Sequence, residues 1–140
     1  MFRKILVAYD GSGGAKLALA KTQEIARAAK ADIHIVAVGR IPEYAETVSE
    51  VEEEKEQAQN YYAKIMDEAQ KEMKEHGLSP DVHIEFGKPA DTILRIAEDL
   101  GVDLLILGTH PHSAVRRRFL GATVDKVIDH AHCSVLVVRK

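Results

Sequence analysis

The sequence predicts an α/β fold, a doubly wound three-layer sandwich on a five-stranded parallel sheet of strand order 3-2-1-4-5. Short runs of β-forming residues alternate with longer stretches of helical periodicity along the whole chain. Helices between consecutive strands act as crossovers, which makes neighbouring strands parallel. The 140 residues, 46% hydrophobic and 29% charged, fit one globular domain, so we expect a single domain over residues 1–140.

Strands are expected at five short β-rich runs that end in turn residues. The first, fourth and fifth runs are almost continuously apolar, which is typical of strands covered by helices on both faces. This pattern predicts a Rossmann-like arrangement with helices on both sides of the sheet. The five runs are Ile5–Tyr9, Ile33–Val38, Val82–Phe86, Leu104–Leu107 and Val135–Val138.

Helices are expected between these strands, where apolar residues recur at spacings of three and four. The second is long and amphipathic, with Ser49 and Glu52 at the spacing of a capping box and Gly77 suited to its end. Ser12 is a candidate cap for the first helix, and Pro89 opens the third. The expected helices are Ser12–Lys30, Thr47–Gly77, Pro89–Leu100 and Thr123–Ala131.

Composition and charge exclude several classes of protein. The 22 acidic and 19 basic residues give a net charge of −3, so no positive field attracts nucleic acid. The single cysteine, Cys133, allows neither an internal disulfide nor a thiolate zinc cluster. Apolar runs are far shorter than the roughly 20 residues that cross a bilayer, and no signal-peptide pattern opens the chain. We expect a cytoplasmic protein with no nucleic-acid or membrane partner.

A ligand of such a fold binds outside the carboxyl ends of the strands, where the strand order reverses. With the order 3-2-1-4-5, that place lies between the first and fourth strands. The loops Asp10–Gly14 and Gly108–Ser113 flank it, and the second strand ends alongside. Two familiar phosphate-binding patterns are absent: Gly87-Lys88 is followed by proline, and the dinucleotide fingerprint fails at Lys16.

Other chemistries have weak support. The pair His110 and His112 could offer imidazoles to a metal ion, but no carboxylate lies in the same local segment. A second pair, His130 and His132, falls at the far end of the last helix. Ser12 lacks the first glycine of a nucleophile elbow. We therefore expect no metal site and no catalytic residue.

The order of several motifs resembles the universal stress protein family over the whole chain. The residues that carry this resemblance are Ile5–Ser12, Gly108-Thr109-His110, Phe119–Val127 and His132–Val138. The resemblance implies a five-stranded α/β fold, usually a homodimer, and in one branch a bound ATP. It implies a regulatory role in the stress response, with slow ATP hydrolysis not excluded.

The nucleotide-binding branch of that family has a loop of the form G-x-x-G, nine residues, then G-[ST]. This chain keeps Gly108, the nine-residue spacing and Gly121. Pro111 replaces the second glycine, which removes an amide hydrogen and fixes φ. Ala122 replaces the hydroxyl residue and so removes a phosphate donor, although Thr123 follows it directly.

The resemblance implies that Asp10 contacts the ribose or adenine and that Val38 offers backbone groups to the base. Glycine and alanine amides of the loop would line the phosphates. The arginines at 116–118 could bind phosphate oxygens, or they could be a solvated loop. Asp10 could equally be a turn residue that competes with Ser12 for the helix cap. The candidate nucleotide-binding residues are Ala8, Asp10, Val38, Gly108, His110, Arg117, Gly121, Ala122 and Thr123.

The last expected strand is an apolar sheet edge, which favours pairing with another strand. Two copies related by a two-fold axis could pair this edge, so we expect a homodimer. The residues at that interface would be Val135, Leu136, Val137 and Val138. Two functions stay open: binding of ATP, with any Mg²⁺ carried by its phosphates, and an interaction module that lost ATP binding through Pro111 and Ala122 and acts on an unknown protein partner.

Overall fold

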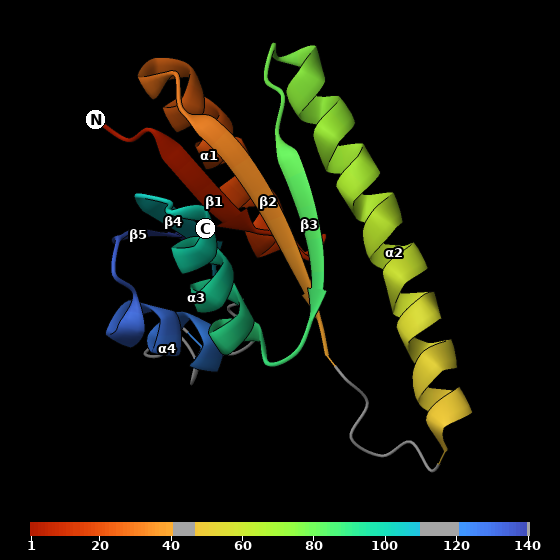
Figure 1. Ribbon diagram of the computed structural model, residues 1–140. Coiled ribbons are helices and arrows are strands. Elements are labelled where there is room, and N and C mark those ends of the chain that lie inside the picture. Colours follow the sequence, from red (N-terminus) through yellow and green to blue (C-terminus); the bar gives the residue numbers. More distant parts are fainter. Residues whose placement is uncertain (41–46, 110–120, 140) are drawn as a thin grey trace.

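The computed structural model describes residues 1–40, 47–109 and 121–139. Its centre is a five-stranded sheet of order β3-β2-β1-β4-β5, in which every neighbouring pair is parallel (Figure 1). The predicted fold class and strand order are therefore confirmed. The strands are β1 (Lys4–Ala8), β2 (Asp32–Gly39), β3 (Asp81–Phe86), β4 (Leu104–Gly108) and β5 (Ser134–Val138), and the helices are α1 (Gly13–Ala29), α2 (Val48–Glu75), α3 (Pro89–Leu100) and α4 (Ala122–His130).

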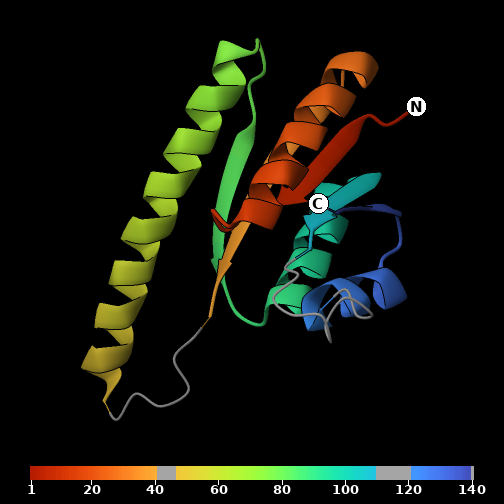
Figure 2. The same cartoon turned by 180° about the vertical axis from the view of Figure 1, so that it is seen from behind.

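The helices form two layers, one on each face of the sheet (Figures 1 and 2). Alternate strand residues supply two separate cores. Ile5 and Val7 of β1 pack with residues of α1 and α2, whereas Leu6 packs with residues of α3 and α4. Each such fully buried side chain contributes roughly 1.5–3 kcal/mol to folding. The division explains why the central strands need apolar residues at consecutive positions.

The long helix begins at a different cap from the one predicted. Thr47 is the N-cap residue, with an extended backbone, and its side-chain oxygen accepts the Glu50 amide at 3.2 Å. The prediction of a box from Ser49 and Glu52 was wrong. The sequence holds two overlapping boxes, and use of the earlier one leaves Ser49 inside the first helical turn.

The other end of α2 follows the prediction. Gly77 has a φ of +78°, a value that costs little for glycine. Its amide donates to the Lys74 carbonyl, and the Leu78 amide donates to the Met73 carbonyl, both at 3.0 Å. These two bonds form a Schellman motif. The motif ends α2 and turns the chain toward β3.

Two imidazoles meet across β2 and β3 on the face that α3 covers. His34 is only 8% exposed, and its Nδ1 lies 3.0 Å from Nε2 of His83. Burial, followed by the proximity of His83, lowers the pKa of His34, while the Asp81 carboxylate at 3.9 Å opposes the shift. The folded protein therefore favours neutral His34.

We expect this histidine pair to make stability depend on pH. Since the folded-state pKa of His34 lies below that of the unfolded chain, the unfolded state binds more protons as pH falls below about 6.5. The Tm of the native protein should fall by a few degrees between about pH 7.5 and about pH 5. His34→Gln should flatten this fall, measured by circular dichroism.

The exposed His132 provides a matched control for that measurement. His132→Gln should keep the slope of Tm against pH seen in the native protein. If His34→Gln and His132→Gln gave the same slope as the native chain, the buried pair would not be its source.

Candidate functional site

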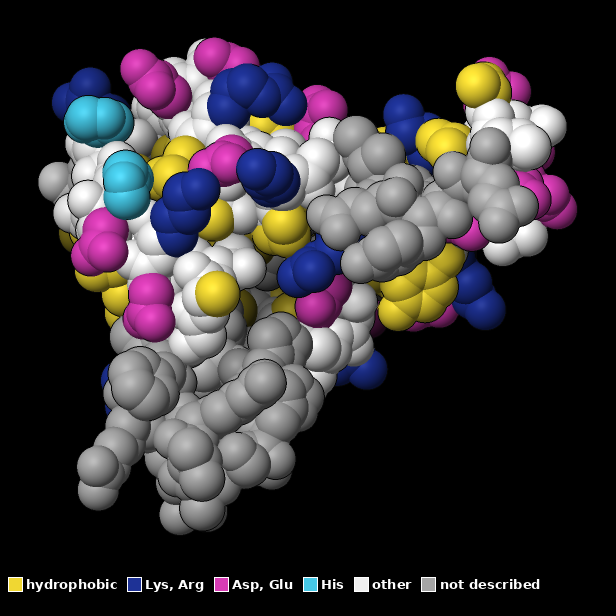
Figure 3. Space-filling view, turned by 90° about the horizontal axis from the view of Figure 1, so that it is seen from below, with side chains coloured by type: hydrophobic (Ala, Val, Ile, Leu, Met, Phe, Trp, Pro, Cys, Tyr) yellow, Lys and Arg dark blue, Asp and Glu magenta, His cyan; other side chains and the backbone are white. Residues whose placement is uncertain are grey.

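A pocket of about 680 Å³ opens where β1, β2 and β4 reach their carboxyl ends. Figure 3 views the molecule from this end, where apolar side chains lie between basic and acidic ones. The pocket lies between β1 and β4, which is where the strand order reverses. The predicted location therefore coincides with this pocket.

At this switch point, the backbone at the start of α1 contacts the backbone at the end of β4. A Cβ added to Gly108 would overlap the carbonyl oxygen of Gly14, and a Cβ added to Gly14 would overlap the carbonyl oxygen of Thr109. Only glycine allows the first turn of α1 to approach the end of β4 so closely. Gly108 therefore has a packing role besides lining the pocket.

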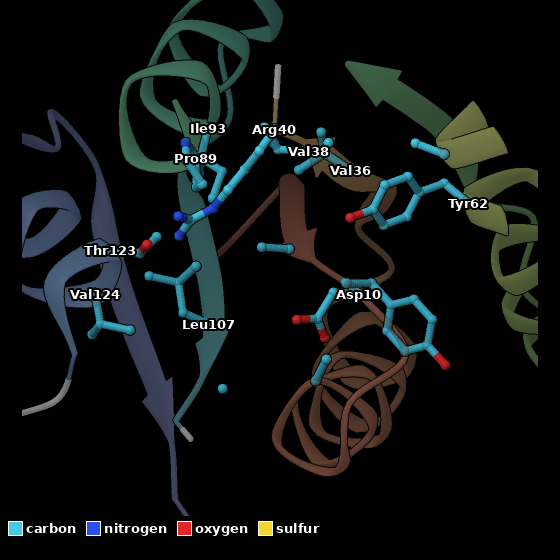
Figure 4. Close-up of a pocket in the computed structure, with 16 residues that line it drawn as sticks. Asp10, Val36, Val38, Arg40, Tyr62, Pro89, Ile93, Leu107, Thr123 and Val124 are labelled. Carbon is cyan, nitrogen blue, oxygen red and sulfur yellow. The ribbon is translucent and has the colours of Figure 1, made fainter. Parts of the chain in front are cut away.

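The turn from β1 to α1 holds the Asp10 carboxylate in place. One carboxylate oxygen of Asp10 accepts the Ser12 amide at 2.9 Å, across Gly11, whose φ is +82°. Ser12 is the N-cap of α1, and its hydroxyl accepts the Ala15 amide at 3.2 Å. Ser12 therefore caps the helix and Asp10 orders the turn, while the ligand contact expected of Asp10 stays a prediction. Figure 4 shows the Asp10 side chain directed into the pocket.

The opposite side of the pocket is the first turn of α4. Its N-cap is Gly121, which has no side chain to cap the helix. The first helical hydrogen bond runs from the Asp125 amide to the Gly121 carbonyl at 2.9 Å. The amides of the three residues between them therefore have no carbonyl partner within the helix. Such amides, together with the helix dipole, favour an anion.

Apolar and aromatic side chains complete the walls. Val38 and Ile93 line the side nearest α3, and Leu107 lines the β4 side. Tyr62 of α2 points its hydroxyl inward (Figure 4). Burial, and then the Asp10 charge, raise the pKa of Tyr62, so its hydroxyl remains a hydrogen-bond donor at neutral pH. The pocket combines an apolar slot with polar groups at its two ends.

The structure gathers most of the predicted site residues at this pocket. The five that line it are Ala8, Asp10, Val38, Gly108 and Thr123. Gly121 and Ala122 are exposed and do not line it, but they immediately precede Thr123 in α4. His110, Pro111 and Arg117 lie outside the described residues. Binding by these residues stays a prediction.

Sequence reasoning missed Arg40 and Tyr62, which also line the pocket. Arg40 directly follows the last residue of β2, so the rule that selected Asp10 after β1 could have found it. Tyr62 carried no such signal, because its position continues the apolar stripe of a long helix. Its polar end becomes visible only once α2 is placed beside the strand ends.

Within residues 1–40, 47–109 and 121–139, no group of three or more histidine, cysteine or acidic residues is arranged to hold a metal ion. Over the same residues, no helix is long and apolar enough to cross a membrane.

Comparisons with known proteins agree on one family. A model of the Universal stress protein family matches residues 1–139. Universal stress protein YxiE of Bacillus subtilis is 31% identical, over 99% of this chain and 100% of that protein. Universal stress protein UspA from Lactobacillus plantarum has a TM-score of 0.85 at 28% identity, over 98% of this chain and 97% of that one. A universal stress protein solved in complex with cAMP has a TM-score of 0.73 at 25% identity, over 98% and 96% of the two chains.

Gly14→Ala tests the backbone contact at the switch point. The added methyl group would meet the Thr109 carbonyl, so we expect the free energy of unfolding to fall by about 1–3 kcal/mol, the usual cost of overpacking. Urea denaturation at constant temperature measures it.

The neighbouring glycine supplies the control. A methyl group on Gly13 meets no atom within 4 Å, and alanine is the better helix former by up to about 1 kcal/mol. Gly13→Ala should leave stability unchanged or raise it. If the two substitutions changed the free energy of unfolding equally, the close approach at Gly14 would not contribute to stability.

Proposed function

The chain belongs to the universal stress protein family, and from this premise we propose that it binds an adenine nucleotide, ATP, in the switch-point pocket. The observation that carries the proposal is the pairing of a fixed carboxylate, Asp10, with the amides at the start of α4 across one apolar slot. A relative at 25% identity was solved in complex with cAMP, which is an adenine nucleotide. We propose a regulatory role in the stress response, in the cytoplasm, carried by one domain over residues 1–140.

Each part of the nucleotide has a matching part of the pocket. The base would lie against Ala8 and Val38, where backbone groups at the strand ends can accept and donate. The Asp10 carboxylate would accept hydrogen bonds from ribose hydroxyls. The phosphates would lie at the start of α4, where the Thr123 hydroxyl stands beside the amides of Gly121 and Ala122. Any Mg²⁺ would be carried by the phosphates. His110 and Arg117 are proposed as further phosphate ligands.

A second function follows from two departures in the phosphate loop. Pro111 has no amide hydrogen and Ala122 has no hydroxyl. Both changes weaken a triphosphate site, which favours an interaction module that acts through a protein partner. The two proposals differ in what nucleotide titration should show.

We expect calorimetric titration of the native protein with ATP and Mg²⁺ to give saturable binding. Thr123→Val keeps the side-chain volume but removes the hydroxyl, so ATP affinity should fall about tenfold, the weight of one hydrogen bond to a charged group. Adenosine affinity should not change. Absence of heat with the native protein, but binding after Pro111→Gly combined with Ala122→Ser, would favour the interaction module instead.

We also propose a homodimer through β5, the apolar edge of the sheet. The Thr109 amide donates to the Val138 carbonyl at 3.2 Å, so Val138 and Leu136 direct their backbone groups toward β4. Since these groups alternate along a strand, those of Val135 and Val137 face the free edge. β5 contains no charged residue that would oppose pairing. A second copy could add its own β5 antiparallel to this one.

Val137→Pro should convert the dimer to a monomer in light scattering at micromolar concentration. Proline removes an amide that would bond the second copy, while the ladder to β4 keeps its own bonds. Val137→Thr retains the amide and should remain dimeric. A native protein that is monomeric, or a proline variant of unchanged mass, would contradict this interface.

A further inference from the structure

Arg40 is the one basic residue among those that line the pocket in the part of the chain that the structure describes. It directly follows β2, two residues beyond Val38, and alternate residues of a strand share a face. Val38 packs with the core on the α3 and α4 side of the sheet. Figure 4 shows the guanidinium reaching from β2 toward Thr123 and Leu107.

Two other basic groups near this end of the sheet are engaged with carboxylates. Lys126 of α4 is 2.6 Å from Asp91, and Arg95 of α3 is 3.7 Å from Glu85. No ion pair or hydrogen bond joins Arg40 to any residue within 1–40, 47–109 or 121–139. The positive charge of Arg40 opposes the upward shift in the pKa of the Tyr62 hydroxyl. Among the described residues, the guanidinium is therefore a charged group at the pocket whose donors no other side chain occupies.

The side of the pocket that Arg40 reaches is also the side where two helices begin. Pro89 of α3 and Thr123 of α4 both line it. The amino end of each helix carries a partial positive charge. Asp10 lies on the other side, in the turn that leads into α1. The electrostatic field of the pocket thus favours an anion between Arg40 and the start of α4.

We propose that Arg40 binds the phosphate nearest the ribose of the nucleotide and supplies donors that Pro111 and Ala122 no longer provide. This inference rests on the proposed function. A guanidinium offers two parallel N–H donors to one phosphate. Because Arg40 stands two residues from the proposed base contact at Val38, the phosphate within its reach is the one that AMP and ATP share. The side-chain donors of the site thus come from the end of β2 as well as from α4.

Titration of the native protein, Arg40→Gln and Arg40→Lys with adenosine, AMP and ATP tests this role. Arg40→Gln should lower the affinities for AMP and ATP by a similar factor, about tenfold or more, because each nucleotide loses one charge-assisted contact. Adenosine should bind as it does to the native protein. Arg40→Lys keeps the charge without the planar pair of donors, so it should lower these two affinities by an intermediate factor.

Arg27→Gln is the matched control, since Arg27 is an exposed arginine in the last turn of α1, away from the pocket. It should leave all three affinities unchanged. The inference is overturned if Arg40→Gln leaves AMP affinity unchanged, if it lowers the affinity for ATP alone, or if it lowers adenosine affinity as much as AMP affinity. A native protein that binds none of the three ligands would overturn the proposed function, and this inference with it. Binding by the native protein that is indifferent to Arg40 would overturn only the inference.

Discussion

The close approach of two glycine backbones, at the start of α1 and the end of β4, determines the geometry of the whole site. At Gly14 and Gly108 the helix start and the strand end lie so close that a single methyl group on either glycine would overlap a carbonyl oxygen. Because α1 starts at this contact, the contact also positions its N-cap, Ser12. The Ser12 amide donates to the Asp10 carboxylate. Main chain therefore bounds the pocket where β4 ends at Gly108, and side chains make its other walls.

Charge is distributed unevenly around this pocket. The acidic end is a single carboxylate held by a turn, and the basic end is made of two helix amino termini with Arg40. An ion pair joins Asp91, in the first turn of α3, to Lys126 of α4, and the Lys126 contact lowers the pKa of Asp91. The Lys126 ammonium thus balances the Asp91 charge on the side where an anion would bind.

The layers and strand order were predictable because each depends on a repeated signal. Five apolar runs separated by helical periodicity leave few ways to bury both faces of a sheet. Asp10, Val38 and Gly108 were predictable by the same logic, since they follow or end strands at the switch point. Arg40 was missed because the second strand was predicted to end at Val38 and no motif covers the residues that follow it. The cap at Thr47 was missed because Thr47 with Glu50 and Ser49 with Glu52 both have the spacing of a capping box. Only the observed start of the helix shows which of the two is used.

The departures at 111 and 122 remove donors of two kinds from the loop motif, and under the proposed function the fold would replace them unequally. The amides at the start of α4 exist because a helix begins there, so a change of side chain at Ala122 leaves its own amide available. A hydroxyl is different, since its donor can be replaced only by another polar side chain at the pocket, and Thr123 and Arg40 both line it. A site of this construction tolerates drift in its loop motif as long as helix starts and strand ends keep their positions. The packing at Gly14 and Gly108 maintains those positions, so the backbone contact constrains the site more strongly than the motif does.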